Sequence, residues 1–298
     1  RSFGLVDYVK PQFRFQGGLF TECSLAMPAI RLEKDGFSFG VDNLRVAIST
    51  TDDGYMLAGQ LATLDVGDLI ELINFAGEKS LVPERLSSAI AAVAPNGRLS
   101  DLFFTSTLDG DQRKIVSNLS DFSMDAYLGV PAIDRLNGFV SLRPGRGYLD
   151  IDNDEFQMNF KSMFSQAWPF DSGRGRIAYR VDNGSLSVSS GLIELTVGDL
   201  EAYGKLFVNL PSVREQQTWG LTLGVSNIEL LEADRFVPNT VPLELVTWMK
   251  SAIHGGSSLE TALTIHGSLF RVSPAVRKAH DLFFKFEDGV VDFQAGLP

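Results

Sequence analysis

The chain has 298 residues and 44% apolar side chains, enough to bury one large core or two ordinary ones, and its formal net charge is −11. This acidic balance argues against nucleic acid and against a basic membrane-binding patch, because both need a concentrated Lys and Arg surface. Cys23 is the single cysteine, so the chain forms no internal disulfide. No apolar run approaches the roughly 18 residues of a spanning helix. The opening Arg1-Ser2-Phe3 lacks Met and a signal sequence, which indicates a fragment of a larger protein.

Alternation of apolar and polar residues with period two begins in the first part of the chain. It is clear in residues 37–41 and 44–48, and it returns in residues 55–64 after the turn signal Asp53-Gly54. Such alternation is typical of β-strands that bury one face. Consecutive strands joined by short turns predict an antiparallel meander.

Two stretches interrupt the strands with helical spacing, near residues 83–94 and near residues 242–253. Each opens with Val-Pro and ends at Gly, as helices commonly do. Aligning the two Val-Pro pairs gives an offset of 159 residues and brings Gly97 onto Gly256. We interpret this match as an internal duplication of a unit made of a strand, a polar turn, a short amphipathic helix, a glycine and a further strand.

The strand pattern is densest between residues 176 and 225. Arg176 to Ser190 predicts a hairpin around the turn Asn183-Gly184, and three further apolar runs follow. The alternating apolar side chains of this region are expected to line one face, and they are Ile177, Tyr179, Val181, Ile193, Leu195, Val197, Leu206, Val208, Leu221, Leu223 and Val225. An error of one residue in register would move any of them to the opposite face.

The last strands flank an expected turn at Asp288-Gly289. The predicted fold class is therefore mainly β, an elongated antiparallel meander that carries two short amphipathic helices from the duplication. Residues 1–140 and 141–298 are expected to form the two repeats of one continuous unit.

The segment from about Gly191 to Gly267 contains Phe236-Val237-Pro238, then a helical stretch with Trp248-Met249, then Gly255-Gly256 and His266-Gly267. This segment resembles the AsmA-like family, and especially its YhdP branch, in which an aromatic-Leu-Pro triplet precedes a helix with Trp-Leu, a glycine and a strand that ends in glycine. Val237 and Met249 stand where the family has leucine. The resemblance implies a periplasmic segment of a protein anchored in the inner membrane. It also implies a long, curved β-sheet with an apolar groove that carries phospholipid between the inner and outer membranes through contacts with acyl chains. The eleven alternating apolar residues between Ile177 and Val225 are the ones we expect nearest this groove.

Alternating apolar residues are also what the core of a β-sandwich contains, so an open face and a covered core are both compatible with the pattern. A structural or scaffolding module of the cell envelope that binds protein partners through sheet edges is the main alternative function. A glycan-processing or hydrolytic enzyme is a third possibility, and it would require a cleft of convergent carboxylates.

No motif of catalysis or cofactor binding stands out in the sequence, and we expect neither a cofactor nor enzymatic activity. His254, His266 and His280 are too far apart for a compact metal site, and His254 is expected to cap a helix end. Residues 150–154 carry Asp at every second position, as the start of a calcium loop does. The required Gly and final Glu are missing, so the pattern does not favour calcium.

Overall fold

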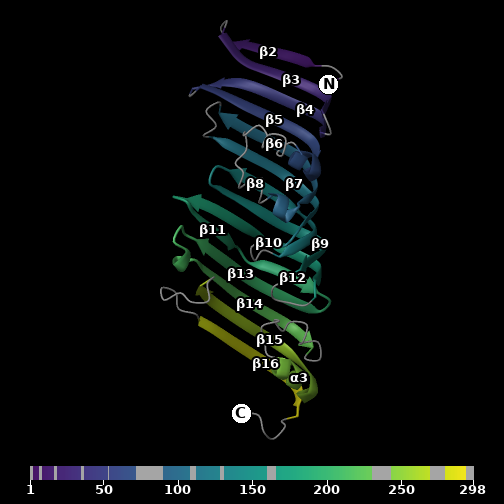
Figure 1. The fold of residues 1–298 in the computed structure, drawn as a ribbon, viewed down its shortest axis with the longest axis vertical. Helices are drawn as coiled ribbons and strands as arrows, with labels where there is room; N and C mark the ends of the chain where they lie inside the picture. Colours follow the sequence, from purple (N-terminus) through teal and green to yellow (C-terminus); the bar gives the residue numbers. More distant parts are fainter. Residues whose placement is uncertain are drawn as a thin grey trace. The chain divides into compact units, whose positions relative to one another are not determined.

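The computed structural model describes residues 3–6, 9–16, 19–34, 37–52, 54–71, 90–107, 112–127, 131–159, 166–229, 243–268 and 279–292. Most of these residues lie in sixteen strands (Figure 1). The strands are β1 (Phe3–Val6), β2 (Lys10–Gln16), β3 (Leu19–Lys34), β4 (Phe37–Thr51), β5 (Gly54–Asp65), β6 (Asn96–Thr107), β7 (Arg113–Met124), β8 (Ala132–Arg143), β9 (Arg146–Asn159), β10 (Trp168–Asp182), β11 (Ser185–Ser190), β12 (Ile193–Val197), β13 (Leu200–Leu210), β14 (Thr218–Glu229), β15 (Ile253–Ser268) and β16 (Ala279–Val291).

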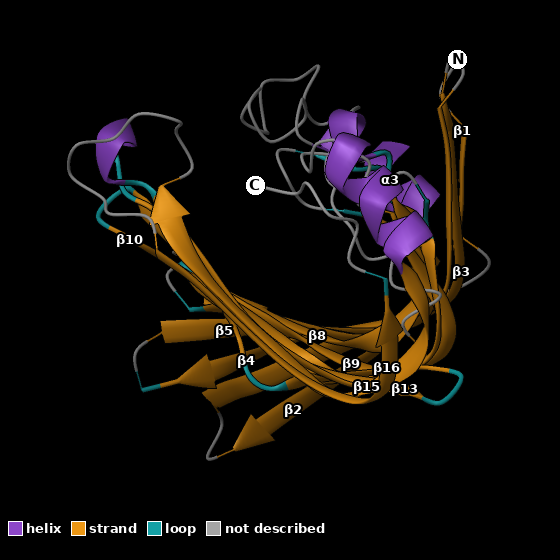
Figure 2. Ribbon diagram, turned by 90° about the horizontal axis from the view of Figure 1, so that it is seen from below, coloured by secondary structure: helices purple, strands orange, loops and turns teal. Residues whose placement is uncertain are grey.

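The strands pair almost entirely in sequence order. The hydrogen-bonded order is β1-β3-β4-β5-β6-β7-β8-β9-β10-β11-β13-β14-β15-β16, with β2 beside β3 and with β12 between β10 and β13. Strand pairs such as β3–β4 and β14–β15 are antiparallel. The strands bend strongly along their length, and α3 (Leu243–Ala252) lies on the inner side of the bend (Figure 2). The predicted mainly β class and the antiparallel meander are confirmed.

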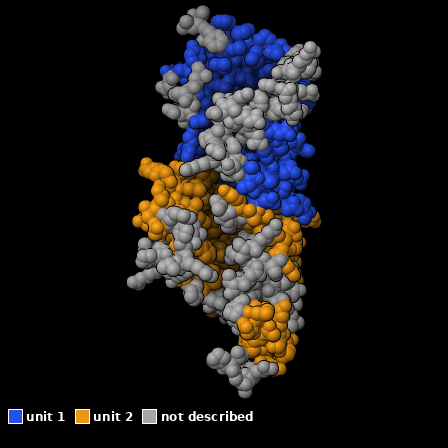
Figure 3. All heavy atoms as spheres, viewed as in Figure 1, with its two compact units in different colours: residues 1–125, 134–149 blue, residues 126–133, 150–298 orange. Residues whose placement is uncertain are grey.

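The chain divides into two compact units (Figure 3). Unit 1 comprises residues 1–125 and 134–149, and unit 2 comprises residues 126–133 and 150–298. The repeat boundary that we expect between residues 140 and 141 stays a prediction.

Local turn chemistry explains the predicted hairpin in unit 2. Asn183 and Gly184 have φ angles of 47° and 76°, which is the pair of left-handed conformations that a tight hairpin turn needs. They join β10 to β11, with Tyr179 opposite Val188. The meander is interrupted after this hairpin, because β11 and β12 do not form the next one. Both strands pair with β10 and with β13, so they follow one another along a single strand position.

The helix that the sequence predicts near residues 242–253 is α3 (Leu243–Ala252), and β15 begins directly after it. Of the helix predicted near residues 83–94, residues 90–93 are helical, and residues 83–89 lie outside the described residues. Residues 66–71 form a further helical segment at the end of β5, where we expected a polar turn.

The expected turn at Asp288-Gly289 is wrong. Both residues lie inside β16, and Asp288 has a φ of 51°. The pairing of β16 with β15 is irregular here, between Gly255 and Ser257. Asp and Gly both tolerate the left-handed conformation, so the same dipeptide serves a turn or a bulge.

The core of unit 1 is built on one face of its sheet. Val41, Leu61, Leu64 and Leu102 are buried together, and Leu69 of the helical segment 66–71 packs against them. The apolar face of unit 1 is thus the one toward its helical segment.

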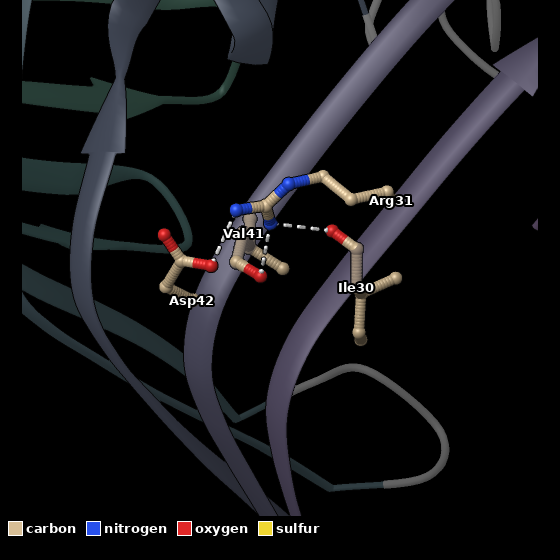
Figure 4. A network of polar contacts seen from close by, with 4 residues as sticks. All are labelled: Ile30, Arg31, Val41 and Asp42. Atoms are coloured by element: carbon tan, nitrogen blue, oxygen red, sulfur yellow. Dashed lines mark hydrogen bonds and ion pairs between the residues drawn. The ribbon is translucent and has the colours of Figure 1, made fainter. Parts of the chain in front are cut away.

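Arg31 joins β3 to β4 beside this core (Figure 4). Its Nη1 donates to the carbonyl oxygens of Ile30 and Val41 at 2.9 and 3.1 Å, and its Nη2 lies 2.6 Å from Asp42 Oδ1. Arg31 is paired with Gly40, whose missing side chain leaves room for the Arg31 methylenes.

Candidate functional site

Strand register places the predicted groove residues of unit 2 on one face. Residues directly opposite each other in an antiparallel pair point to the same side of the sheet. Between β13 and β14, Leu206 is opposite Leu221 and Val208 is opposite Trp219. The two strands therefore contribute neighbouring apolar side chains to a common surface.

The same face continues through the short strands on the other side of β13. Val188 is opposite both Tyr179 of β10 and Val208 of β13. In β12, Ile193 is opposite Gly204 and Leu195 is opposite Ala202. All eleven predicted side chains consequently share one surface, which we call the apolar face: Ile177, Tyr179, Val181, Ile193, Leu195, Val197, Leu206, Val208, Leu221, Leu223 and Val225.

The apolar face extends beyond the predicted set onto β15. Leu221 is opposite Ile265 and Leu223 is opposite Leu263. Leu263 is in turn opposite residue 282 of β16. Sequence reasoning missed β15, although Leu263 and Ile265 alternate with Thr264 and His266 in the same period-two pattern.

Charged side chains occupy the opposite side of the same strands, which we call the charged face. At the paired positions of β10–β16 whose side chains the structure describes, the Asp, Glu, Lys and Arg residues lie there, and the apolar face carries none. The charged-face residues include Arg174, Arg180, Asp182, Glu194, Glu201, Lys205, Glu260, Asp281 and Lys285. Opposite charges meet across strands where Arg174 faces Glu194 and where Glu260 faces Lys285. Such pairs suit a surface that stays in water.

Exposure follows the same division. On β13, the charged-face residues Glu201, Tyr203 and Lys205 are exposed, whereas Leu206 and Val208 are half-buried. Side chains converge on the inner side of a bent sheet and spread on its outer side, so we assign the apolar face to the inner side. Val181, near the end of β10, is the most exposed of the eleven predicted residues, at 47%.

Two aromatic side chains, from β9 and β10, lie next to the apolar face. Phe156 and Phe170 stack with ring centroids 5.0 Å apart, and both are buried. A Cβ atom at Gly173 would lie 2.6 Å from the Phe156 ring and 3.1 Å from Leu195. The missing side chain of Gly173 thus leaves room for the Phe156 ring and for Leu195.

The histidines and aspartates that drew attention in the sequence do not come together. His254 lies in β15, just beyond the end of α3, and its Nε2 is 3.0 Å from Asp292 Oδ2; its expected role at the helix end stays a prediction. His266 lies on the charged face with its ring 5.8 Å from that of Phe207. The side chain of His280 is outside the described part of the structure.

Two of the aspartates in residues 150–154 form cross-strand ion pairs. Asp150 Oδ2 accepts from Arg176 Nη2 at 2.7 Å, and Asp152 Oδ1 accepts from Arg174 Nε at 3.0 Å. These carboxylates therefore already have cationic partners. Within the part of the chain that the structure describes, no three His, Cys, Asp or Glu residues are grouped closely enough to hold a metal ion.

A bent antiparallel sheet with an uncharged apolar face and a charged outer face defines an amphipathic β-sheet module. The family model described as YhdP protein matches residues 23–298, so the chain belongs to the YhdP family, and the resemblance seen in the sequence is confirmed. Neither a curated protein nor a solved structure matches the chain. Of the helices in the described ranges, none has the length and apolar character needed to cross a membrane.

Proposed function

We propose that this chain is a segment of a bacterial envelope lipid-transport protein, which guides phospholipid acyl chains along the apolar face between the inner and outer membranes. The observation that carries the proposal is the separation of charge: where the structure describes the side chains at the paired positions of β10–β16, the apolar face has no Asp, Glu, Lys or Arg. Membership of the YhdP family, which is associated with the cell envelope, supports it.

Acyl chains suit this surface because it offers similar surroundings from strand to strand. The row Leu206–Leu221–Ile265 is followed by Gly204–Leu223–Leu263 and then by Ala202–Val225–Thr261. Each methylene that leaves water for such a surface contributes about 0.8 kcal/mol. An acyl chain that moves from one row to the next loses and regains this contribution. It therefore stays bound to the face but can move along it.

The polar head group of the lipid is expected to stay in water. The apolar face offers it no charged partner at the paired positions, and desolvating a charged phosphate without a partner is costly. Transport along this face therefore depends on the acyl chains, and it requires no catalytic residue. We place the segment in the periplasm, with anchoring to the inner membrane and contact with the outer membrane supplied by other parts of the protein.

Native mass spectrometry with lipid extraction tests the proposal on the chain purified from a bacterial host. We expect co-purified phospholipid in the unmodified protein and its loss in Leu195→Glu and Leu223→Glu, because a carboxylate on the apolar face repels acyl chains. Thr222→Glu is the matched control, since Thr222 precedes Leu223 on the exposed charged face. Thr222→Glu should retain the lipid. A folded protein that is consistently free of lipid would overturn the proposal.

One observation favours the second candidate, a scaffolding module that binds protein partners through sheet edges. β2 pairs with β3 and lies off the main strand order, and its Phe13 and Phe15 are 62% and 63% exposed. Exposed aromatic residues on a strand of this kind can anchor a partner strand. Loss of partner binding in Phe13→Ser and Phe15→Ser, with a protein free of lipid, would support this candidate.

A further inference from the structure

The period-two pattern slips by one residue within many long strands of this protein. Each slip leaves two inward residues separated by two others instead of one. The pairs are Val41 and Leu44, Leu61 and Leu64, Leu99 and Leu102, Leu119 and Phe122, Asn153 and Phe156, and Val225 and Ile228. A regular strand would place the members of each pair on opposite faces, because its side chains alternate.

A left-handed residue accompanies most of these slips. It occupies the third position of the four, and the φ angles are 56° at Asn43, 51° at Asp101, 50° at Asp121, 53° at Glu155 and 61° at Asn227. The register between β6 and β7 shifts beside Asp101 and beside Asp121. A left-handed residue at a bulge rotates the strand about its axis. The side chain that follows it therefore points to the inward face and not to the opposite one.

In unit 2 the side-chain contacts show this return directly. Val225 is opposite Thr261, and Ile228 is opposite Ser258. Ser258 Oγ lies 2.8 Å from Thr261 Oγ1, so these two side chains are on the same face. Ile228 is therefore on the apolar face with Val225, although three positions separate them.

Asn227 is held in place by more than its own backbone. Its Nδ2 donates to the carbonyl oxygen of Asp199, in the turn before β13, at 3.2 Å. Asn is one of the few side chains that tolerate the left-handed region well, whereas a β-branched residue there is a strong outlier. Asn227 thus combines a permitted conformation with an anchor to the neighbouring strand.

We propose that Asn227 is a positioning residue for the lipid track. Its left-handed conformation puts Ile228 beside Val225 and so extends the apolar face past the bend of β14, toward the end of β15 that joins α3. Without it, Ile228 would turn to the charged face with Thr222. That this surface carries lipid rests on the proposed function, whereas the placement of Ile228 can be tested separately.

The test compares Asn227→Val with Asn227→Gly in the full chain. Glycine adopts positive φ freely and should keep Ile228 inward, whereas valine should not. In a Cys23→Ser, Ile228→Cys background, we expect a charged maleimide to label residue 228 at least about fivefold faster with Asn227→Val, and at an unchanged rate with Asn227→Gly. Asn227→Ala, which is strained but not β-branched, provides an intermediate variant if Asn227→Val does not fold.

A second readout uses a phospholipid with a photoreactive acyl chain, and mass spectrometry locates the crosslinks. We expect crosslinks at both Leu223 and Ile228 in the unmodified chain and in Asn227→Gly, and at Leu223 alone in Asn227→Val. Equal maleimide labelling and equal crosslinking at residue 228 in all folded variants would overturn the positioning role. If Leu223 takes no crosslink even in the unmodified chain, the proposed function fails, while the maleimide rates still decide the role of Asn227.

Discussion

Gly97 and Gly256 lie 159 residues apart and have the same structural role. Their φ angles are 131° and 114°, and each lies against a left-handed aspartate of the next strand, Asp121 and Asp288 respectively. The helical segment before each glycine also ends alike. The carbonyl oxygen of Val93 accepts from Asp125 N at 2.7 Å, and that of Ala252 accepts from Asp292 N at 2.8 Å. This local equivalence supports the internal duplication predicted from the sequence.

The first prediction concerns these two glycines. A Cβ atom would lie 2.8 Å from the backbone at Gly97 and 2.7 Å from it at Gly256. Because of this close contact and the positive φ angles, we expect Gly97→Ala and Gly256→Ala each to lower the free energy of unfolding by about 1–3 kcal/mol. Urea denaturation measures this change. The matched control is Gly255→Ala, because a Cβ atom there meets nothing within 4 Å. An equal loss in the control would contradict the argument.

The second prediction concerns Phe207, which covers Gly220 on the charged face. The two residues are opposite each other, and a Cβ atom at Gly220 would fall 2.2 Å from the Phe207 ring. Gly220→Ala should therefore destabilise the native protein but should be neutral or stabilising in a Phe207→Ala background. We expect a coupling free energy of about 1 kcal/mol or more in a double-mutant cycle measured by thermal unfolding.

Gly224 provides the control for this cycle, since it lies on the same strand and face. Its nearest contact for a Cβ atom is the Tyr203 carbonyl oxygen at 3.8 Å. Gly224→Ala should show no coupling to Phe207→Ala. A coupling as large as that of Gly220 would show that the effect comes from the strand as a whole and not from the ring.

The third prediction concerns Asp68 in the helical segment 66–71. Burial, followed by the nearby charges of Asp65 and Glu71, raises the pKa of the Asp68 carboxyl above 3.8, although Arg31 opposes this change. A raised pKa means that the folded state favours the protonated form. Asp68 therefore imposes no penalty below pH 3.8, and it lowers stability as the pH rises through its folded-state pKa.

Asp68→Asn should for this reason be more stable than the unmodified chain at neutral pH, and the two should converge in acid. Unfolding measured across the pH range checks this expectation. Asp65→Asn removes one of the charges that raise the pKa of Asp68, so it should lower that pKa in an NMR titration. A stability difference that grows toward low pH would have the wrong sign and would refute the assignment.

The fourth prediction concerns Ser117, which is 1% exposed at the bulge of β6 and β7. Its Oγ lies 2.9 Å from the carbonyl oxygens of Ser100 and Asn118 and can donate to either one. Ser117→Ala removes this buried hydroxyl and its hydrogen bond, so we expect a loss of about 1 kcal/mol in the free energy of unfolding. Ser189→Ala, on the exposed charged face, should change it by less than about 0.5 kcal/mol. Comparable losses at both serines would argue against the buried hydrogen bond.

Sequence alone determined the features of this protein that depend on neighbours along the chain. Alternation with period two identified the strands of unit 2 and sorted each strand into an apolar and a polar side. Asn183-Gly184 specified the hairpin because both residues tolerate positive φ, and the spacing of apolar residues located α3. These signals are local, so they can be read without knowing which strands pair.

Tertiary structure decided how the sides of different strands combine. Alternation gives the two sides of a strand but does not say which side faces that of its neighbour, because register is set by pairing between distant residues. Only the pairing showed that Leu195, Leu206 and Leu223 share one face and that the charged residues of β10–β16 share the other. The slip at Asn227 and the bulge at Asp288 depend on the same pairing, since Asn and Asp serve turns and bulges equally well.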